Sequence, residues 1–119
     1  MAKRIAGTCY IKVDGTQLEI KGGLEIPIAE VSRETIMGAS GPAGFKETAI
    51  VPSVKFTGIF TADFPIAKLV SGTDMTITSE LANGKVHTLS GAYLVGEATA
   101  KVEDGEIDLE FNGSKGIWK

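Results

Sequence analysis

The sequence predicts an all-β domain with one short helix, folded as a β-sandwich or barrel. Glycine supplies 15 of 119 residues, about twice its usual ~7%, which is typical of a chain with many tight turns. Asp-Gly and Asn-Gly dipeptides separate pairs of alternating segments, the pattern of β-hairpins. Apolar runs stay well short of the roughly 20 residues that cross a bilayer. A chain of this length indicates a single domain, residues 1–119.

Three hairpins are expected, with turns at Asp14-Gly15, Asn83-Gly84 and Asp104-Gly105. Both residues of such dipeptides tolerate the positive φ of a type I′ turn, whose twist matches that of the flanking strands. Each dipeptide is flanked by a polar and apolar alternation with a period of two, so antiparallel pairing is predicted on both sides.

The segment 106–111 has the cleanest alternation in the chain. Its apolar residues are expected to face the core, and its acidic residues to face water. The inward set is Ile107, Leu109 and Phe111, and the outward set is Glu106, Asp108 and Glu110. In the partner segment the residues expected to face inward are Ala98, Ala100 and Val102.

A second inward face is expected in the segment 54–60. Val54, Phe56 and Phe60 share one side of a predicted strand, and Gly58 lies between them. Glycine at an inward position suggests that another backbone crosses closely there.

One helix is predicted, over residues 63–71. Asp63 is the expected N-cap and Pro65 lies in the first turn, where its missing N–H costs little. Ile66, Leu69 and Val70 have the spacing of an apolar helical face, and Gly72 follows as a C-cap. A single helix on an all-β chain is expected to close one open end of the sandwich.

The sequence offers little for catalysis or metal binding, and we predict neither an enzyme nor a cofactor. The net charge of −3 comes without a basic stripe, so a nucleic-acid binder is not indicated. Cys9 has no partner cysteine and is expected to be a small buried residue. His87 is expected to be a partly exposed strand residue; a Ser-His-Asp triad through it lacks a G-x-S-x-G elbow. The glycines of "GASGPAG" lack the lysine of a phosphate-binding loop.

Three segments have too little apolar content to fold alone. They are the N-terminal arm 1–7, the loop 37–47 ("MGASGPAGFKE") and the C-terminal tail 112–119, which carries the only tryptophan. Long loops in compact domains are usually functional or disordered, and tryptophan is a favoured interface anchor. We therefore predict self-assembly through these segments. The expected contact residues are Ile5, Met37, Gly38, Gly41, Pro42, Phe45, Lys46, Glu47 and Trp118.

Nearly the whole chain resembles the tail tube proteins of Mu-like, contractile-tailed phages. The resemblance rests on "SRETIMGASGPAGFKETAIVPSVKFTGIFTADFPIAKL" followed by "TITSELANGKVHTLSGAYLVGEATAKVEDGEIDLEFNG". Its most specific parts are the end of the loop with the P-x-V lead-in, the "ELANGK" hairpin, and the "VGE", "EDGE" and "FNG" order near the end.

The resemblance implies a β-sandwich related to the type VI secretion tube protein, closing into hexameric rings that stack into a hollow tube. It implies as partners further copies of the chain, the tail sheath, the tape measure protein, and the baseplate, tube initiator and tube terminator proteins. DNA would cross the channel without specific binding. The expected location is the virion tail, after synthesis in the host bacterial cytoplasm, without membrane binding; the N-terminus does not read as a secretory signal.

Two expectations refine this interpretation. The loop 37–47 would be poorly ordered in a free subunit and would fold against an adjacent ring, with Phe45 as anchor. Glu106, Asp108 and Glu110 would lie either in the lumen or on the outer wall, and alternation does not decide between them. Calcium binding or sugar hydrolysis is the alternative for this acidic row, although a solvated sheet face is more typical. The alternative function is a monomeric β-barrel module that binds a ligand.

Overall fold

The computed structural model describes residues 9–119, and for Cys9 only the backbone. Within this range nine strands form one strongly bent sheet, in the order β2-β1-β7-β8-β10-β6-β3, with β11 paired to β8 and β9 paired to β10. The strands of the first half of the sheet are β1 (Cys9–Val13), β2 (Thr16–Leu18), β7 (Met75–Leu81), β8 (Val86–Leu94) and β11 (Lys115–Trp118). Those of the second half are β3 (Ile20–Glu25), β6 (Ser53–Ile59), β9 (Ala100–Lys101) and β10 (Glu106–Asn112).

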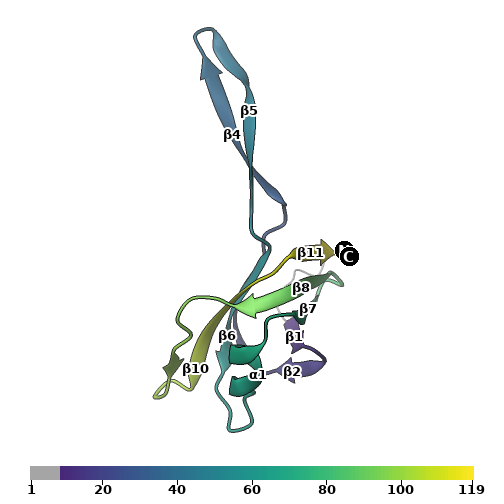
Figure 1. The fold of residues 1–119 in the computed structure, drawn as a ribbon, viewed down its shortest axis with the longest axis vertical. Coiled ribbons are helices and arrows are strands. Elements are labelled where there is room, and N and C mark those ends of the chain that lie inside the picture. The colour runs from purple at the N-terminus through teal and green to yellow at the C-terminus, as the bar shows by residue number, and fades with distance from the viewer. Residues whose placement is uncertain (1–8) are drawn as a thin grey trace, which may run out of the picture.

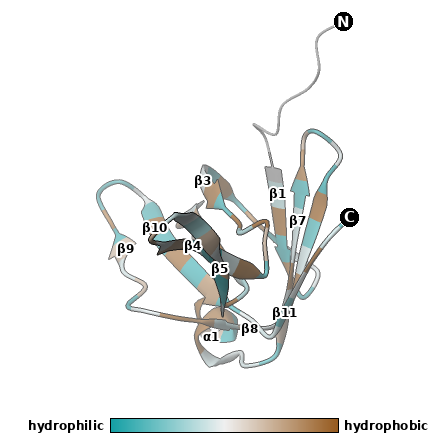
Figure 2. Ribbon diagram, turned by 90° about the horizontal axis from the view of Figure 1, so that it is seen from above, coloured by the Kyte–Doolittle hydropathy of each residue, from teal (hydrophilic) through white to brown (hydrophobic). Residues whose placement is uncertain are grey.

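The two halves fold over a common core, so the expected sandwich is confirmed. Figure 2 shows β1, β7 and β11 on one side of the body and β3, β9 and β10 on the other. They are joined where β10 pairs with the end of β8, through Phe111 opposite Leu94. Phe56 and Phe111 stack in the core with ring centroids 6.0 Å apart. The other fully buried large side chains are Ile11, Val13, Val54, Leu69, Ile77 and Leu89.

All three predicted hairpins are present, but only the first has a turn with two positive φ angles. Asp14 and Gly15 have φ of 49° and 86° between β1 and β2, as a type I′ turn requires. Between β7 and β8 only Gly84 has a positive φ, and the Gly84 N–H bonds the Leu81 carbonyl. That geometry is a turn closed by a left-handed glycine, the usual three-residue hairpin loop.

In the hairpin around Gly105, the inward residues of β10 are as predicted, but those of the partner segment are not. In β10, Ile107, Leu109 and Phe111 are buried, as expected. The partner β9 is only Ala100–Lys101. Val102 is 80% exposed, because it lies in the turn and not in a strand, and Ala98 is also exposed.

A neighbouring backbone lies beside Gly58, as expected, but the contact does not require a glycine. A Cβ at this position would lie 3.5 Å from Cγ2 of Ile107 and 3.6 Å from the backbone oxygen of Glu19. Strand β3 pairs irregularly with β6 here, and a Cβ at residue 58 would make ordinary van der Waals contacts.

The helix is shorter than predicted. Helix α1 (Ile66–Ser71) begins after Pro65 and makes no side-chain N-cap bond; Asp63 instead accepts a 2.6 Å hydrogen bond from Thr61. Gly72 is extended, and its N–H bonds the Lys68 carbonyl. Only Leu69 reaches the core, whereas Ile66 and Val70 are 52% and 66% exposed, so the expected three-residue buried face is wrong.

A second, two-stranded sheet projects from the body (Figure 1). It consists of β4 (Val31–Gly38) and β5 (Gly41–Ala49), which pair with each other and with no other strand of the described residues. The molecule measures 61 × 42 × 27 Å, and its radius of gyration is 17.2 Å. A compact chain of this length is expected near 13 to 14 Å. The excess reflects the projecting hairpin.

Candidate functional site: a projecting hairpin and the pocket at its base

The segment expected to be a loop is the outer part of a long β-hairpin. Residues 37–47 form the end of β4, the tip and most of β5. Pairing runs from Val31 opposite Ala49 to Gly38 opposite Gly41, with one irregularity after Ile36. The loop assignment was wrong because the strand signal of alternating apolar residues requires one buried face. Both faces of this hairpin are exposed.

The charged side chains of the hairpin pair with one another. Arg33 Nε lies 3.6 Å from the Glu47 carboxylate, and Lys46 Nζ lies 3.3 Å from that of Glu34. Each pair joins residues directly across the two strands, and the two pairs are on opposite faces because Arg33 and Glu34 are consecutive residues of β4. The Arg33 guanidinium also lies 5.0 Å from the centre of the Phe45 ring. Lys46 and Glu47, which were expected to contact a partner, thus already have partners within the hairpin.

The apolar side chains of the hairpin have no cover. Ile36, Met37 and Phe45 are 43%, 67% and 58% exposed. Within residues 9–119, no hydrogen bond or ion pair joins the segment 32–48 to the body. A two-stranded hairpin alone in water is at best marginally stable. These features indicate a surface that another molecule covers.

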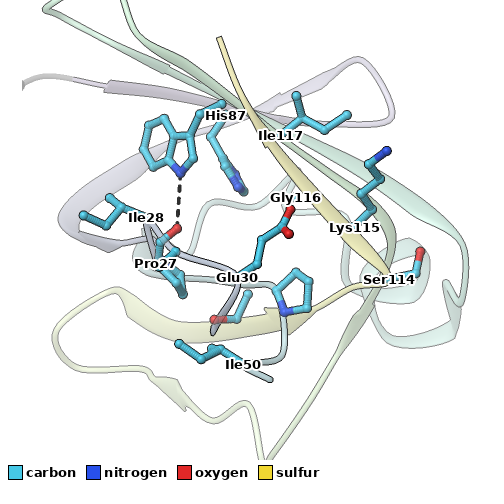
Figure 3. A pocket seen from close by; sticks show the side chains of 13 residues that line it. Pro27, Ile28, Glu30, Ile50, His87, Ser114, Lys115, Gly116 and Ile117 are labelled. Atoms are coloured by element: carbon cyan, nitrogen blue, oxygen red, sulfur yellow. Dashed lines mark hydrogen bonds between the residues drawn. The ribbon is translucent and has the colours of Figure 1, made fainter. Parts of the chain in front are cut away.

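A pocket of about 630 Å³ opens where the hairpin joins the body (Figure 3). Both connections of the hairpin form its walls, together with β11 and one residue of β8. The lining residues are Pro27, Ile28, Ala29, Glu30, Ile50, Pro52, Ser53, His87, Ser114, Lys115, Gly116, Ile117 and Trp118.

Trp118 connects the body to the first arm of the hairpin. Its indole Nε1 donates a 3.2 Å hydrogen bond to the Pro27 carbonyl, and its ring packs on His87 with centroids 4.9 Å apart. Trp118 belongs to β11, which pairs with β8, so residues 112–119 are not a free tail. The expectation that the tail 112–119 has too little apolar content to fold alone was wrong, because β11 extends the sheet beyond the last predicted strand and packs Trp118 on His87.

His87 is buried, in contrast to the sequence-based expectation. It is 3% exposed, and its Nδ1 has no hydrogen-bond partner among the described residues. Burial lowers the pKa of His87, because the charged ring would lose its hydration. The ring has room because residue 116 is glycine: a Cβ there would lie 2.8 Å from His87 Nε2.

Backbone hydrogen bonds fix the two segments, 26–30 and 50–52, that connect the hairpin to the body. The Ile50 N–H bonds the Glu30 carbonyl at 3.0 Å, and the Gly113 N–H bonds the Pro52 carbonyl at 2.9 Å. With the bond to Pro27, these contacts attach each arm to the body at one point. Sequence reasoning missed this base. The sequence feature that could have located this base is the pair of prolines, Pro27 and Pro52, on either side of the hairpin.

The acidic row on β10 is largely neutralised. Glu106 pairs with Lys21, and Asp108 lies 3.1 Å from Lys101 Nζ. A hydrogen bond from Thr57, followed by that from Lys101, lowers the pKa of Asp108. Glu110 stands opposite Lys55 in the ladder. The row is therefore a balanced face, not an acidic cluster.

Of the other expected contact residues, Ile5 lies outside the described residues, as does the arm 1–7. Across residues 9–119 there is no cluster of His, Cys, Asp and Glu that could hold a metal ion. In the same part of the chain, no helix is long and apolar enough to cross a membrane.

Comparison with solved structures shows the same fold in contractile injection systems. The chain superposes on the anti-feeding prophage cap, the AFP tube terminating cap, with a TM-score of 0.65 and 8% identity, over 100% of this chain and 94% of that one. It superposes on a chain of the PVC sheath-tube complex in the extended state with a TM-score of 0.61 and 10% identity, over 99% and 91%. For the PVC sheath/tube terminator the values are 0.59 and 10%, over 93% and 92%.

Sequence comparison identifies the family. No curated protein sequence matches the chain. The profile of the family described as "Phage tail tube protein" matches residues 2–118, almost the entire length. The chain belongs to the phage tail tube protein family.

Proposed function

We propose that this chain is the structural subunit of the inner tail tube of a Mu-like contractile phage, forming hexameric rings that stack into a conduit for DNA. The observation that carries the proposal is the β4–β5 hairpin, which projects from the body with both faces exposed. A hairpin with uncovered apolar side chains is suited to contact a neighbouring copy.

Two kinds of contact are needed to build a tube, and the fold offers a surface for each. Among residues 9–119, the end strands β2 and β3 of the sheet have one partner each along the sheet order, so their outer edges can pair within a closed ring. The hairpin leaves the body on one side only, so its contact with another copy is head-to-tail. A head-to-tail contact directed along the tube axis does not close into a ring, so it grows a filament.

The balanced face of β10 is compatible with a DNA conduit, whether it lines the lumen or the outer wall. Lys21, Lys55 and Lys101 offset the three acidic side chains of the row. Affinity for DNA comes largely from neutralising phosphates with unpaired lysine and arginine. A face on which carboxylates engage Lys21 and Lys101 should let DNA pass without retaining it.

The proposed partners follow from the same role. One structural neighbour is a chain of a sheath-tube complex, and two others are tube-terminating proteins. We propose that this chain binds a tail sheath on its outer wall, a tape measure protein in its lumen, and initiator and terminator proteins at the tube ends. Its location would be the virion tail, after assembly in the host cytoplasm.

The test is concentration-dependent assembly of the purified chain. Negative-stain electron microscopy should show rings or hollow tubes of uniform width, and sedimentation velocity should show species much larger than a monomer. A second candidate is a monomeric ligand-binding module, favoured by the 630 Å³ pocket, which has the size of a small-molecule site. A monomer at every concentration that binds a small ligand would support that candidate and contradict the tube.

A further inference from the structure

Helix α1 carries an apolar surface that the fold leaves uncovered. The spacing of Ile66, Leu69 and Val70 is that of one buried helix face, yet only Leu69 is buried. Beside the helix is a cleft of about 160 Å³. It is lined entirely by uncharged, apolar residues: Phe60, Phe64, Ile66, Leu69, Val70, Leu94, Ala98, Ala100, Ile107 and Leu109.

The nearest charged side chain on the helix is already engaged elsewhere. Lys68 Nζ donates to the Val13 carbonyl at 3.3 Å and to the Thr16 hydroxyl at 3.2 Å, toward the β1–β2 turn. An occupant of the cleft therefore needs no charge, and a charged group placed there would lose hydration without gaining a partner.

The hairpin tip has the matching chemistry. Residues 37–44 ("MGASGPAG") contain no charged residue, and Met37 at the end of β4 is 67% exposed. Phe45, farther from the tip, is held by Arg33. Methionine is flexible and fills irregular apolar gaps well. The cleft volume suits a side chain of this size.

The two surfaces lie at opposite ends of the molecule. In Figure 1 the hairpin points up and α1 lies at the lower end of the body. Translating one copy along the long axis would bring its α1 end over the tip of the next copy's hairpin. The pocket at the hairpin base is a poorer receptor, because it would enclose Glu30, Lys115 and His87.

We propose that the cleft beside α1 receives the hairpin tip of a second copy in the adjacent ring, with Met37 as the inserted side chain. This inference rests on the proposed function and specifies its stacking contact. Two complementary patches at different places on one chain make a heterologous contact, which grows a filament when its geometry does not close a ring.

Cysteine pairs test the contact directly. In a Cys9→Ala background, one copy carries Met37→Cys and another carries Val70→Cys; they are mixed, assembled and treated with diamide. A disulfide-linked dimer should appear in the mixture and not in either copy alone. The matched control replaces Val70→Cys with Ile28→Cys, an 88% exposed residue at the hairpin base, and should give no dimer.

The outcomes separate the inference from the proposed function. Tubes without the Met37–Val70 crosslink, or with a Met37–Ile28 crosslink, would overturn the inference and leave the tube standing. Absence of both tubes and crosslinks would overturn both. As a second measurement, Val70→Lys should abolish tubes but not the folded circular dichroism spectrum, whereas Ile28→Lys should leave tubes intact. Tubes formed normally by Val70→Lys would also overturn the inference.

Discussion

The indole of Trp118 bonds the carbonyl of Pro27 at 3.2 Å, joining residues 91 apart in sequence. This contact ties the last strand of the body to the first arm of the projecting hairpin (Figure 3). It sets the direction in which the hairpin leaves the body, and hence where its tip can meet another subunit.

Trp118→Phe should keep the ring on His87 but lose the hydrogen bond. Removing one neutral hydrogen bond costs about 1 kcal/mol of unfolding free energy, measurable by urea denaturation. Because the hairpin direction is less fixed, the protein concentration needed for tube formation should rise. Ile117→Ala, on the neighbouring residue of β11, is the control and should leave that concentration unchanged. Equal assembly by Trp118→Phe and wild type would show that the bond does not orient the hairpin.

The burial of His87 should make the stability of the protein depend on pH. Burial puts its folded pKa below the ordinary value of about 6.5, so the unfolded chain binds the proton more readily. The stabilisation is complete above the unfolded pKa and decreases as pH falls below it toward the folded pKa. Urea midpoints at pH 7.5 and 5.5 should therefore differ more for wild type than for His87→Gln. The same difference in both proteins would mean that His87 titrates normally.

Replacing Gly116 by alanine should destabilise the protein through a steric clash with His87. In Gly116→Ala the new Cβ would lie 2.8 Å from Nε2 of a ring that is 3% exposed, so the ring must shift. Overpacking of this kind costs about 1 to 3 kcal/mol. In a His87→Ala background the same change should cost less, giving a coupling energy in a double-mutant cycle. Purely additive effects on unfolding free energy would contradict this contact.

The features predicted well from sequence are those set by local chemistry. Asp14-Gly15 forms its turn because both residues tolerate positive φ, and β10 alternates because one face is buried by the sheet itself. Long-range packing was not visible in the same way. His87 is buried because β11 brings Trp118 over it, and nothing near His87 in the sequence signals that strand.

The β4–β5 hairpin was not predicted because its local sequence is typical of a loop. Its glycines and Pro42 read as a loop, and the signal of a half-buried strand is absent because neither face touches the body. The expected contact residues at its tip were nevertheless placed together on one projecting element. Ile66 and Val70 show the converse: they lie on the predicted helix at the expected spacing, but no other part of residues 9–119 buries them.

If the hairpin stacks subunits into a tube, deleting Gly38 to Gly44 should prevent that stacking. The deletion removes the tip and shortens only the β4–β5 sheet, which shares no strand with the core. Wild type and deletion variant are concentrated side by side and imaged by negative-stain electron microscopy, with sedimentation velocity. We expect long tubes from wild type, and folded subunits or single rings from the variant. Full-length tubes from the deletion variant would contradict stacking through the hairpin.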